Sequence, residues 1–192
     1  MDNNLAKCLT KRAQVAYASG SVAFTMLERL LLLYVPFYFL PSREYHLPNL
    51  IPEETFLGLA TILGAALALG RIVDAAADPV VATISDNLRS SRGRRQPFLL
   101  LSALPLAALT VLIFYPPNLD GESLINGIWL ALMMAMFYIA FTAYVNPYLS
   151  VLSEISHTNA TRIKQIKLLH YRLSTVSGIM DYIIIKAFVV FA

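Results

Sequence analysis

The chain has 192 residues, of which 57% are hydrophobic and only 14% are charged, and its mean hydropathy is +0.61. A compact soluble domain cannot bury this much apolar surface, so the composition argues against a water-soluble domain and predicts a membrane protein. The net charge of +3 does not indicate nucleic-acid binding, because the basic residues fall in short segments between apolar runs.

Five apolar runs are long enough to cross the bilayer as helices. They cover residues 17–40, 56–84, 97–115, 124–149 and 166–192. The first run is too long for a signal peptide and no small-residue cleavage site follows it, so we expect a retained helix. The single cysteine, Cys8, forms no disulfide within the chain and is expected on the reducing, cytoplasmic side.

The predicted fold is therefore an all-α membrane bundle of five transmembrane helices. Many transporters are built from repeated bundles that rock around a central site, and half of such a protein contains six helices. We accordingly expect residues 1–192 to be an incomplete first half, with the C-terminal half absent from this chain.

The segments that connect the runs alternate in basic charge. Lys and Arg are frequent before residue 17, between 85 and 96, and between 150 and 165, whereas the two other connectors carry only Arg43. Because Lys and Arg mark the cytoplasmic side, we predict a protein of the inner or plasma membrane whose N-terminus lies on the cytoplasmic side.

The second run carries three charges at membrane depth, where each costs roughly 2.5–3.5 kcal/mol on insertion scales. Arg71, Asp74 and Asp78 are spaced three and four residues apart, which places them on one helical face. Arg71 can pair with Asp74 one turn away. Asp78 then has no basic partner on its own helix.

An aspartate in this position has two uses, binding a proton or binding Na⁺ together with other oxygen ligands. Pro79 frees the carbonyl of Ala75, which is a further candidate ligand. The alternative is purely structural, with Asp78 paired to Arg29 or Arg172 on another helix.

Further polar residues occur within the other runs. Glu28 and Arg29 are adjacent and point about 100° apart, so each is expected to meet another helix, in salt bridges that hold the bundle or in contact with a solute. The fourth run has polar residues around a proline, which indicates a kink lining a cavity or an ordinary kinked helix; they are Thr142, Tyr144, Asn146 and Tyr148, around Pro147.

Two stretches of sequence are specific enough to suggest a family. They read GRIVDAAADP at residues 70–79 and RGRRQPF at 92–98, with Asp86 between them. This pattern resembles the glycoside–pentoside–hexuronide:cation symporters of the major facilitator superfamily. The resemblance is strongest over residues 70–98, with a weaker echo from Thr142 to Tyr148.

The resemblance implies a cation site for Na⁺, Li⁺ or H⁺ made by Asp74, Asp78 and Thr142. It also implies alternating access around a site at the midplane. The loop that carries Asp86, Arg92, Arg94 and Arg95 would form interhelical charge pairs that hold the inward-closed state, and Arg172 lies about where the family has a helix-five arginine that shapes the site.

Several positions depart from the sugar-transporting members. Ser21, Val145 and Leu149 stand where those members have an aspartate, an aspartate and an aromatic residue, and Ala77 replaces an asparagine. The resemblance implies a sugar or glycoside, whereas these departures favour a lysolipid or another amphiphile, and Ala77 favours H⁺ over Na⁺. Ser21 joins Glu28, Arg29, Tyr144, Asn146, Tyr148 and Arg172 as a candidate for the substrate cavity.

The expected function is therefore solute transport coupled to a monovalent cation. The expected partners are the lipid bilayer, the solute, the cation and a second bundle, with no cofactor and no metal beyond the Na⁺ site. The histidines and serines show no catalytic spacing, so no enzyme is expected. The alternative is an inactive fragment or a membrane assembly partner.

Overall fold

The computed structural model describes residues 11–41, 47–56, 60–87, 96–155, 178 and 182. These belong to two compact units, which are described separately. The larger unit, Tyr34–Tyr148, holds the end of helix α1, all of α2 and α3, and most of α4. The described part of the other unit contains the earlier turns of α1 and the last turns of α4.

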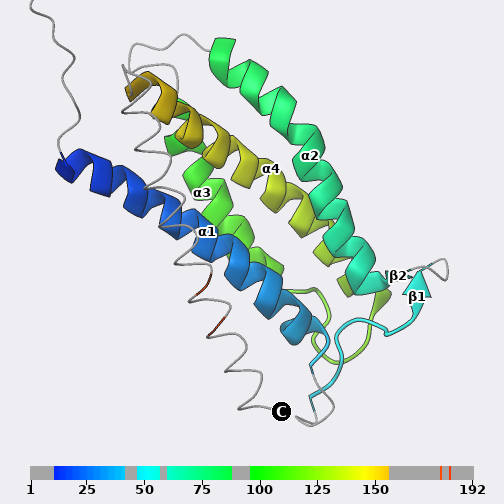
Figure 1. Cartoon of the computed structure of the whole chain (residues 1–192). Coiled ribbons are helices and arrows are strands. Elements are labelled where there is room, and N and C mark those ends of the chain that lie inside the picture. The colour runs from blue at the N-terminus through cyan, green and yellow to red at the C-terminus, as the bar shows by residue number, and fades with distance from the viewer. Residues whose placement is uncertain are drawn as a thin grey trace, which may run out of the picture. The chain divides into compact units, whose positions relative to one another are not determined.

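The described elements are mostly helical and follow the predicted runs (Figure 1). In chain order they are α1 (Lys11–Phe39), β1 (Thr55–Phe56), β2 (Ala60–Thr61), α2 (Ile62–Asn87), α3 (Gln96–Ile113) and α4 (Leu124–Ile155). The predicted fifth helix, 166–192, lies outside the described residues except for Gly178 and Tyr182, which are both helical.

The predicted start of the second helix at residue 56 was wrong. Thr55–Phe56 and Ala60–Thr61 instead pair as two short antiparallel strands, in which Thr55 pairs with Thr61. Helix α2 begins only after Thr61, whose hydroxyl oxygen accepts a hydrogen bond from the backbone N–H of Gly64 at 3.1 Å. This is the geometry of an N-cap, which satisfies a backbone donor that has no partner within the helix.

Two described helices are long and apolar enough to cross a membrane, over Gly20–Phe39 and Leu124–Ser150. Helix α3 contributes a shorter apolar stretch, Leu99–Ile113. Helix α2 carries Arg71, Asp74 and Asp78 within its apolar sequence. That five helices span the bilayer therefore stays a prediction.

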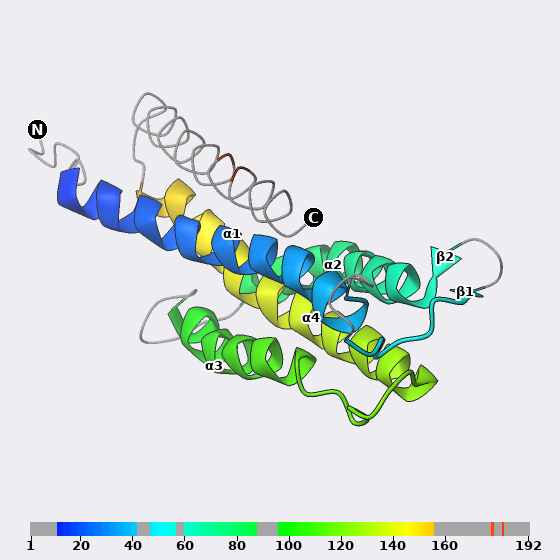
Figure 2. The same ribbon diagram turned by 90° about the horizontal axis from the view of Figure 1, so that it is seen from below.

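Within the larger unit, α4 lies between α2 and α3 (Figure 2). Its buried residues Leu130, Met134, Phe137 and Tyr138 supply much of the core. The indole N–H of Trp129 donates to the carbonyl of Leu112 on α3 at 3.2 Å. In contrast, large apolar residues of α3 and α4 are exposed, as a lipid-facing surface requires; examples are Leu100, Leu101, Leu104, Ile125, Ile128 and Leu132.

A network of hydrogen bonds around Asn126 lies at one end of this unit. Asn126 is fully buried, and its amide donates to the carbonyls of Leu50 at 2.9 Å and Asn118 at 2.7 Å. Its side-chain oxygen accepts the backbone N–H of Asn118 at 3.1 Å. The Ser123 N–H also donates to the Leu50 carbonyl at 3.1 Å, so the loop before β1 is joined to the loop before α4.

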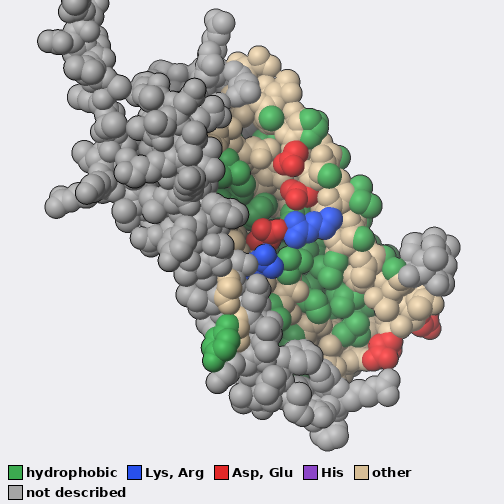
Figure 3. Space-filling model, viewed as in Figure 1, with side chains coloured by type: hydrophobic (Ala, Val, Ile, Leu, Met, Phe, Trp, Pro, Cys, Tyr) green, Lys and Arg blue, Asp and Glu red, His purple; other side chains and the backbone are tan. Residues whose placement is uncertain are grey.

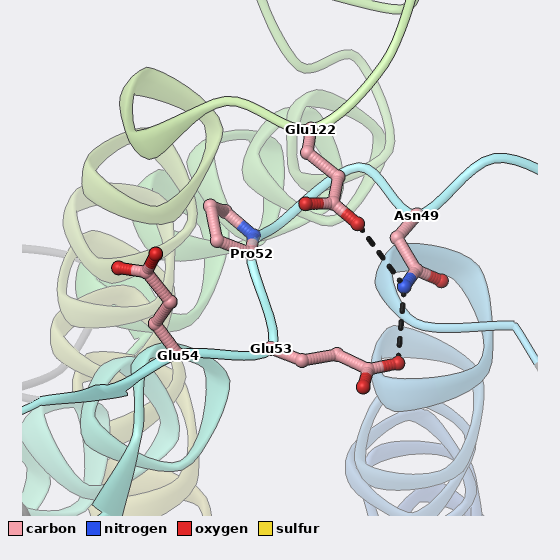
Figure 4. Close-up of a pocket in the computed structure, with 5 residues that line it drawn as sticks. All are labelled: Asn49, Pro52, Glu53, Glu54 and Glu122. Atoms are coloured by element: carbon pink, nitrogen blue, oxygen red, sulfur yellow. Dashed lines mark hydrogen bonds between the residues drawn. The ribbon is translucent and has the colours of Figure 1, made fainter.

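Beside this hydrogen-bond network, the surface has a pocket with acidic side chains. A pocket of about 440 Å³ is lined by Asn49, Pro52, Glu53, Glu54 and Glu122 (Figure 4). The amide of Asn49 donates to Glu53 at 3.1 Å and to Glu122 at 3.4 Å. Asn49 thus bridges carboxylates from the same two loops that Asn126 joins.

Candidate functional site

Helices α2 and α4 run parallel and meet in a series of contacts spaced one turn apart. Gly70 faces the ring of Tyr138, Asp74 meets Thr142, and Asp78 meets Asn146. The polar pairs are both separated by 68 positions in sequence, so the two helices keep one register over this length. Residues four apart share a helical face, which brings both carboxylates to the surface that α2 shares with α4.

Asp74 is the better-enclosed carboxylate of the two. Its Oδ1 accepts the hydroxyl of Thr142 at 2.6 Å, and Thr142 is only 2% exposed. Its Oδ2 lies 3.7 Å from the guanidinium of Arg71. That guanidinium also lies 4.8 Å from the ring centroid of Tyr138, in a cation–π contact. Arg71 therefore rests between an aromatic face and a carboxylate.

Asp78 lies one turn further along and is exposed. The Asn146 amide donates to its Oδ1 at 3.1 Å and to its backbone carbonyl at 3.4 Å. Within the described part of the larger unit, Asp78 has no basic partner. From the sequence, two other basic residues are candidate ion-pair partners of Asp78. Arg29 belongs to the other unit, and Arg172 lies outside the described residues.

The described α2 face thus carries two acids against one base. In Figure 3, acidic and basic side chains gather along α2 among hydrophobic ones. Two carboxylates beside a single guanidinium leave one uncompensated negative charge, which is costly in an apolar environment unless a cation balances it. Carboxylate and hydroxyl oxygens are ligands that hard cations prefer. The arrangement can therefore hold a monovalent cation or a proton.

The other predicted site residues do not all gather here. Tyr144 and Tyr148 stack on each other with ring centroids 6.3 Å apart and planes at 15°. They are offset by two residues from Thr142 and Asn146, which turns them about 200° around α4 and away from α2. The structure therefore separates these tyrosines from Asn146, with which the sequence had grouped them.

The remaining candidates lie in the other unit or outside the described side chains. Ser21 is fully buried, and its carbonyl accepts the Thr25 hydroxyl at 2.9 Å. Glu28 and Arg29 lie on α1 in the smaller unit, and both make interactions. The predicted gating loop falls on side chains that the structure does not describe, as does the helix-five arginine; these are Asp86, Arg92, Arg94, Arg95 and Arg172.

Two features of the site were missed by sequence reasoning. The contact of Asn146 with Asp78 was not predicted, nor was the contact of Tyr138 with Arg71. A signal was present, because Tyr138, Thr142 and Asn146 repeat every four residues, as do Gly70, Asp74 and Asp78. Matching the two repeats would have required the register between the helices.

The sequence is similar to that of a known protein family and of several known proteins. Residues 16–192 match the model of a family described as MFS/sugar transport protein. An uncharacterized symporter of Synechocystis is 28% identical over 135 residues, covering 67% of this chain and 25% of that protein. The inner membrane symporter YicJ of Escherichia coli is 23% identical over 183 residues, covering 94% of this chain and 36% of that protein.

A third relative has a named substrate. The lactose permease of Lactobacillus helveticus is 27% identical over 119 residues, covering 62% of this chain and 17% of that protein. The chain thus spans about a quarter to a third of the length of the first two relatives. No solved structure matches.

The family match extends over nearly the whole chain and includes both helices of the candidate site. The relatives are named as symporters and a permease, which are transporters of the membrane and not enzymes. The resemblance first suggested by residues 70–98 is confirmed at this level. The chain belongs to the MFS/sugar transport protein family of membrane transporters.

Proposed function

We propose that the chain forms the N-terminal part of a secondary active transporter that couples solute movement to Na⁺ or H⁺ by alternating access. The observation that carries this proposal is the α2–α4 contact surface, where Thr142 and Asn146 hold the carboxylates of Asp74 and Asp78. The family match and the symporter names of the relatives support it. No catalytic group or cofactor is needed for this activity.

The proposed mechanism follows from charge balance. Asp74, Asp78 and Thr142 supply the oxygens that bind the cation, and the cation neutralises the uncompensated negative charge on α2. The protein passes through an occluded state at a lower free-energy cost when the buried site is neutral than when it is charged. Cation binding therefore biases the equilibrium between inward-open and outward-open forms, as alternating access requires.

Arg71 has a defined part in this scheme. Its guanidinium lies 3.7 Å from Asp74 and also makes a cation–π contact with the Tyr138 ring, so it has two favourable interactions. A cation that binds Asp74 weakens the Arg71–Asp74 attraction without displacing Arg71 from the aromatic face. The ion pair and the cation thus compete for one carboxylate.

The proposed solute is a sugar or glycoside, on the strength of the family description and the lactose permease relative. The alternative is a lysolipid or another amphiphile, because Val145 and Leu149 present apolar groups on α4 and Leu149 is 41% exposed. A sugar needs polar groups that reach its hydroxyls, whereas an amphiphile needs an apolar wall.

The proposed location is the inner or plasma membrane, with several spans and a cytoplasmic N-terminus. The alternating basic connectors support this orientation. Because the matched part of the chain covers between 17% and 36% of the length of the three relatives, we propose that a second bundle completes the transport pathway. The rival proposal is an inactive fragment or an assembly partner.

Uptake in proteoliposomes tests the proposal. The chain is reconstituted together with a second bundle that completes the pathway, and it is offered labelled sugars and lysolipids, with and without inward Na⁺ and H⁺ gradients. We expect gradient-dependent uptake of one class, and we expect Asp78→Asn to abolish it. Asp120→Asn is a matched control, since Asp120 is an exposed loop residue away from the site. Gradient-driven uptake that survives Asp78→Asn contradicts the proposed cation site, and a folded chain that moves no solute supports the fragment alternative.

A further inference from the structure

The amide of Asn146 has a specific place between the two helices. Asp74 is held by two groups, the Thr142 hydroxyl and the Arg71 guanidinium. In the described residues Asp78 is held across the helix pair by Asn146, which donates both to its carboxylate at 3.1 Å and to its carbonyl at 3.4 Å. The orientation of the exposed carboxylate of Asp78 therefore depends on this one side chain.

The backbone around this contact makes the dependence stronger. Asp78 directly precedes Pro79, and Asn146 directly precedes Pro147, so the contact joins the two points at which α2 and α4 contain a proline. A proline has no N–H to donate, and each helix therefore lacks one hydrogen bond there. Where a backbone hydrogen bond is missing, side-chain contacts have to hold the two helices in their local geometry.

The chemistry of the site requires such fixing for one class of ion. A proton needs only one carboxylate oxygen, whereas Na⁺ or Li⁺ needs several oxygens at fixed positions at the same time. Asp78 can share an ion with Asp74 and Thr142 only if its carboxylate points toward them. The amide nitrogen of Asn146, which donates to both the side chain and the backbone carbonyl of Asp78, restrains this carboxylate without adding charge.

We infer that Asn146 is a positioning residue of the cation site, which orients Asp78 so that it shares one Na⁺ or Li⁺ with Asp74 and Thr142. This inference rests on the proposed function. It assigns Asn146 to the cation and not to the solute cavity, and it supplies from α4 the amide that Ala77 does not provide on α2. It predicts selectivity for an alkali cation at this site.

The test is a binding titration with radioactive sodium on the purified chain in lipid nanodiscs, followed by displacement with Li⁺. Asn146→Leu keeps the size of the side chain but removes its hydrogen bonds. We expect its dissociation constant for Na⁺ to rise about tenfold to a hundredfold, the loss typical of a hydrogen bond to a charged group. The number of sites per chain is expected to stay unchanged, and the Na⁺ to Li⁺ preference to shift.

Two further variants separate positioning from folding. Asn146→Gln keeps the amide on a longer stem, and we expect it to bind Na⁺ more tightly than Asn146→Leu. Asn87→Leu is the matched control, because the Asn87 amide donates to the Thr83 carbonyl of its own helix at 2.9 Å. We expect wild-type affinity from this control.

A wild-type dissociation constant in Asn146→Leu overturns the inference. So does a fall in the number of sites at constant affinity, because that pattern indicates a structural role alone. Asp78→Asn in the same titration separates this failure from that of the proposed function: if Asp78→Asn abolishes binding while Asn146→Leu does not weaken it, only the inference fails. A wild-type chain that binds no Na⁺ overturns the inference, and the proposed function is then judged by proton-driven uptake.

Discussion

The close contact of α2 with α4 at Gly70 makes a quantitative prediction. A Cβ at this position would lie 2.8 Å from Cδ2 and 3.0 Å from Cε2 of the Tyr138 ring, and 3.4 Å from Cβ of Met134. Carbon atoms in contact prefer about 3.5–4.0 Å, so Gly70→Ala forces the helices apart by several tenths of an ångström. The ring cannot yield easily, because Tyr138 is 1% exposed and packs edge-on against Phe137 and Phe141.

The magnitude follows from two opposing terms. Overpacking a buried contact costs about 1–3 kcal/mol, and the severity of this overlap points to the upper half of that range. Alanine in a helix recovers about 1 kcal/mol relative to glycine. The net free energy of unfolding is therefore expected to fall by about 1–2 kcal/mol. The displacement also lengthens the 2.6 Å bond from Thr142 to Asp74 one turn away, so Na⁺ affinity should fall as well.

The assay is unfolding in a denaturing detergent, followed by the fluorescence of the single tryptophan, Trp129. Gly178→Ala serves as the control, because a Cβ there meets nothing within 4 Å and the position is helical. We expect Gly178→Ala to be neutral or slightly stabilising. If Gly70→Ala is as stable as Gly178→Ala and binds Na⁺ as tightly as wild type, the close α2–α4 packing is wrong.

Two other substitutions test separate parts of the structure. Asn126→Leu removes the three hydrogen bonds of the buried amide and leaves polar groups of Asn118 unpaired, so we expect the free energy of unfolding in detergent to fall by about 2–5 kcal/mol. Asn49→Leu, in the neighbouring exposed pocket, should lower it by less than about 1 kcal/mol. Equal losses in the two variants would contradict the assigned role of Asn126. Thr142→Val keeps the shape but removes the donor to Asp74, so Na⁺ binding should weaken about tenfold to a hundredfold; unchanged binding would exclude Thr142 from the site.

The helices were largely predictable because apolar length is visible in a sequence. The runs at 97–115 and 124–149 correspond to α3, Gln96–Ile113, and α4, Leu124–Ile155. The start of α2 was not predictable, since residues 55–61 are apolar enough to continue a helix, whereas Thr55–Phe56 and Ala60–Thr61 pair as strands. The cap at Thr61 became recognisable only once that pairing was known.

The site was predictable on one helix and not between helices. The spacing of Arg71, Asp74 and Asp78 fixes a common face on α2, and the structure shows the Arg71–Asp74 ion pair that this spacing predicted. The partners on α4 depend on how the two helices are aligned, which composition and periodicity do not reveal. Asn146 was accordingly grouped with Tyr144 and Tyr148, although it lies on the opposite side of α4.

Buried polar residues outside the site were missed for a similar reason. Asn126 looks in sequence like an ordinary residue at the start of an apolar run. Its importance comes from the carbonyls of Leu50 and Asn118, which reach it from two separate loops. Contacts between distant segments of the chain are the part of the fold that local pattern does not specify.

The central claim is that Asp74 and Asp78 together bind a single cation. Calorimetric titration of Na⁺ into the nanodisc-embedded chain, compared with Asp74→Asn, Asp78→Asn and the control Asp120→Asn, tests it most directly. We expect one site per chain in wild type and in Asp120→Asn, and loss of that site in either α2 variant. A site that persists in both α2 variants would contradict cation binding by Asp74 and Asp78.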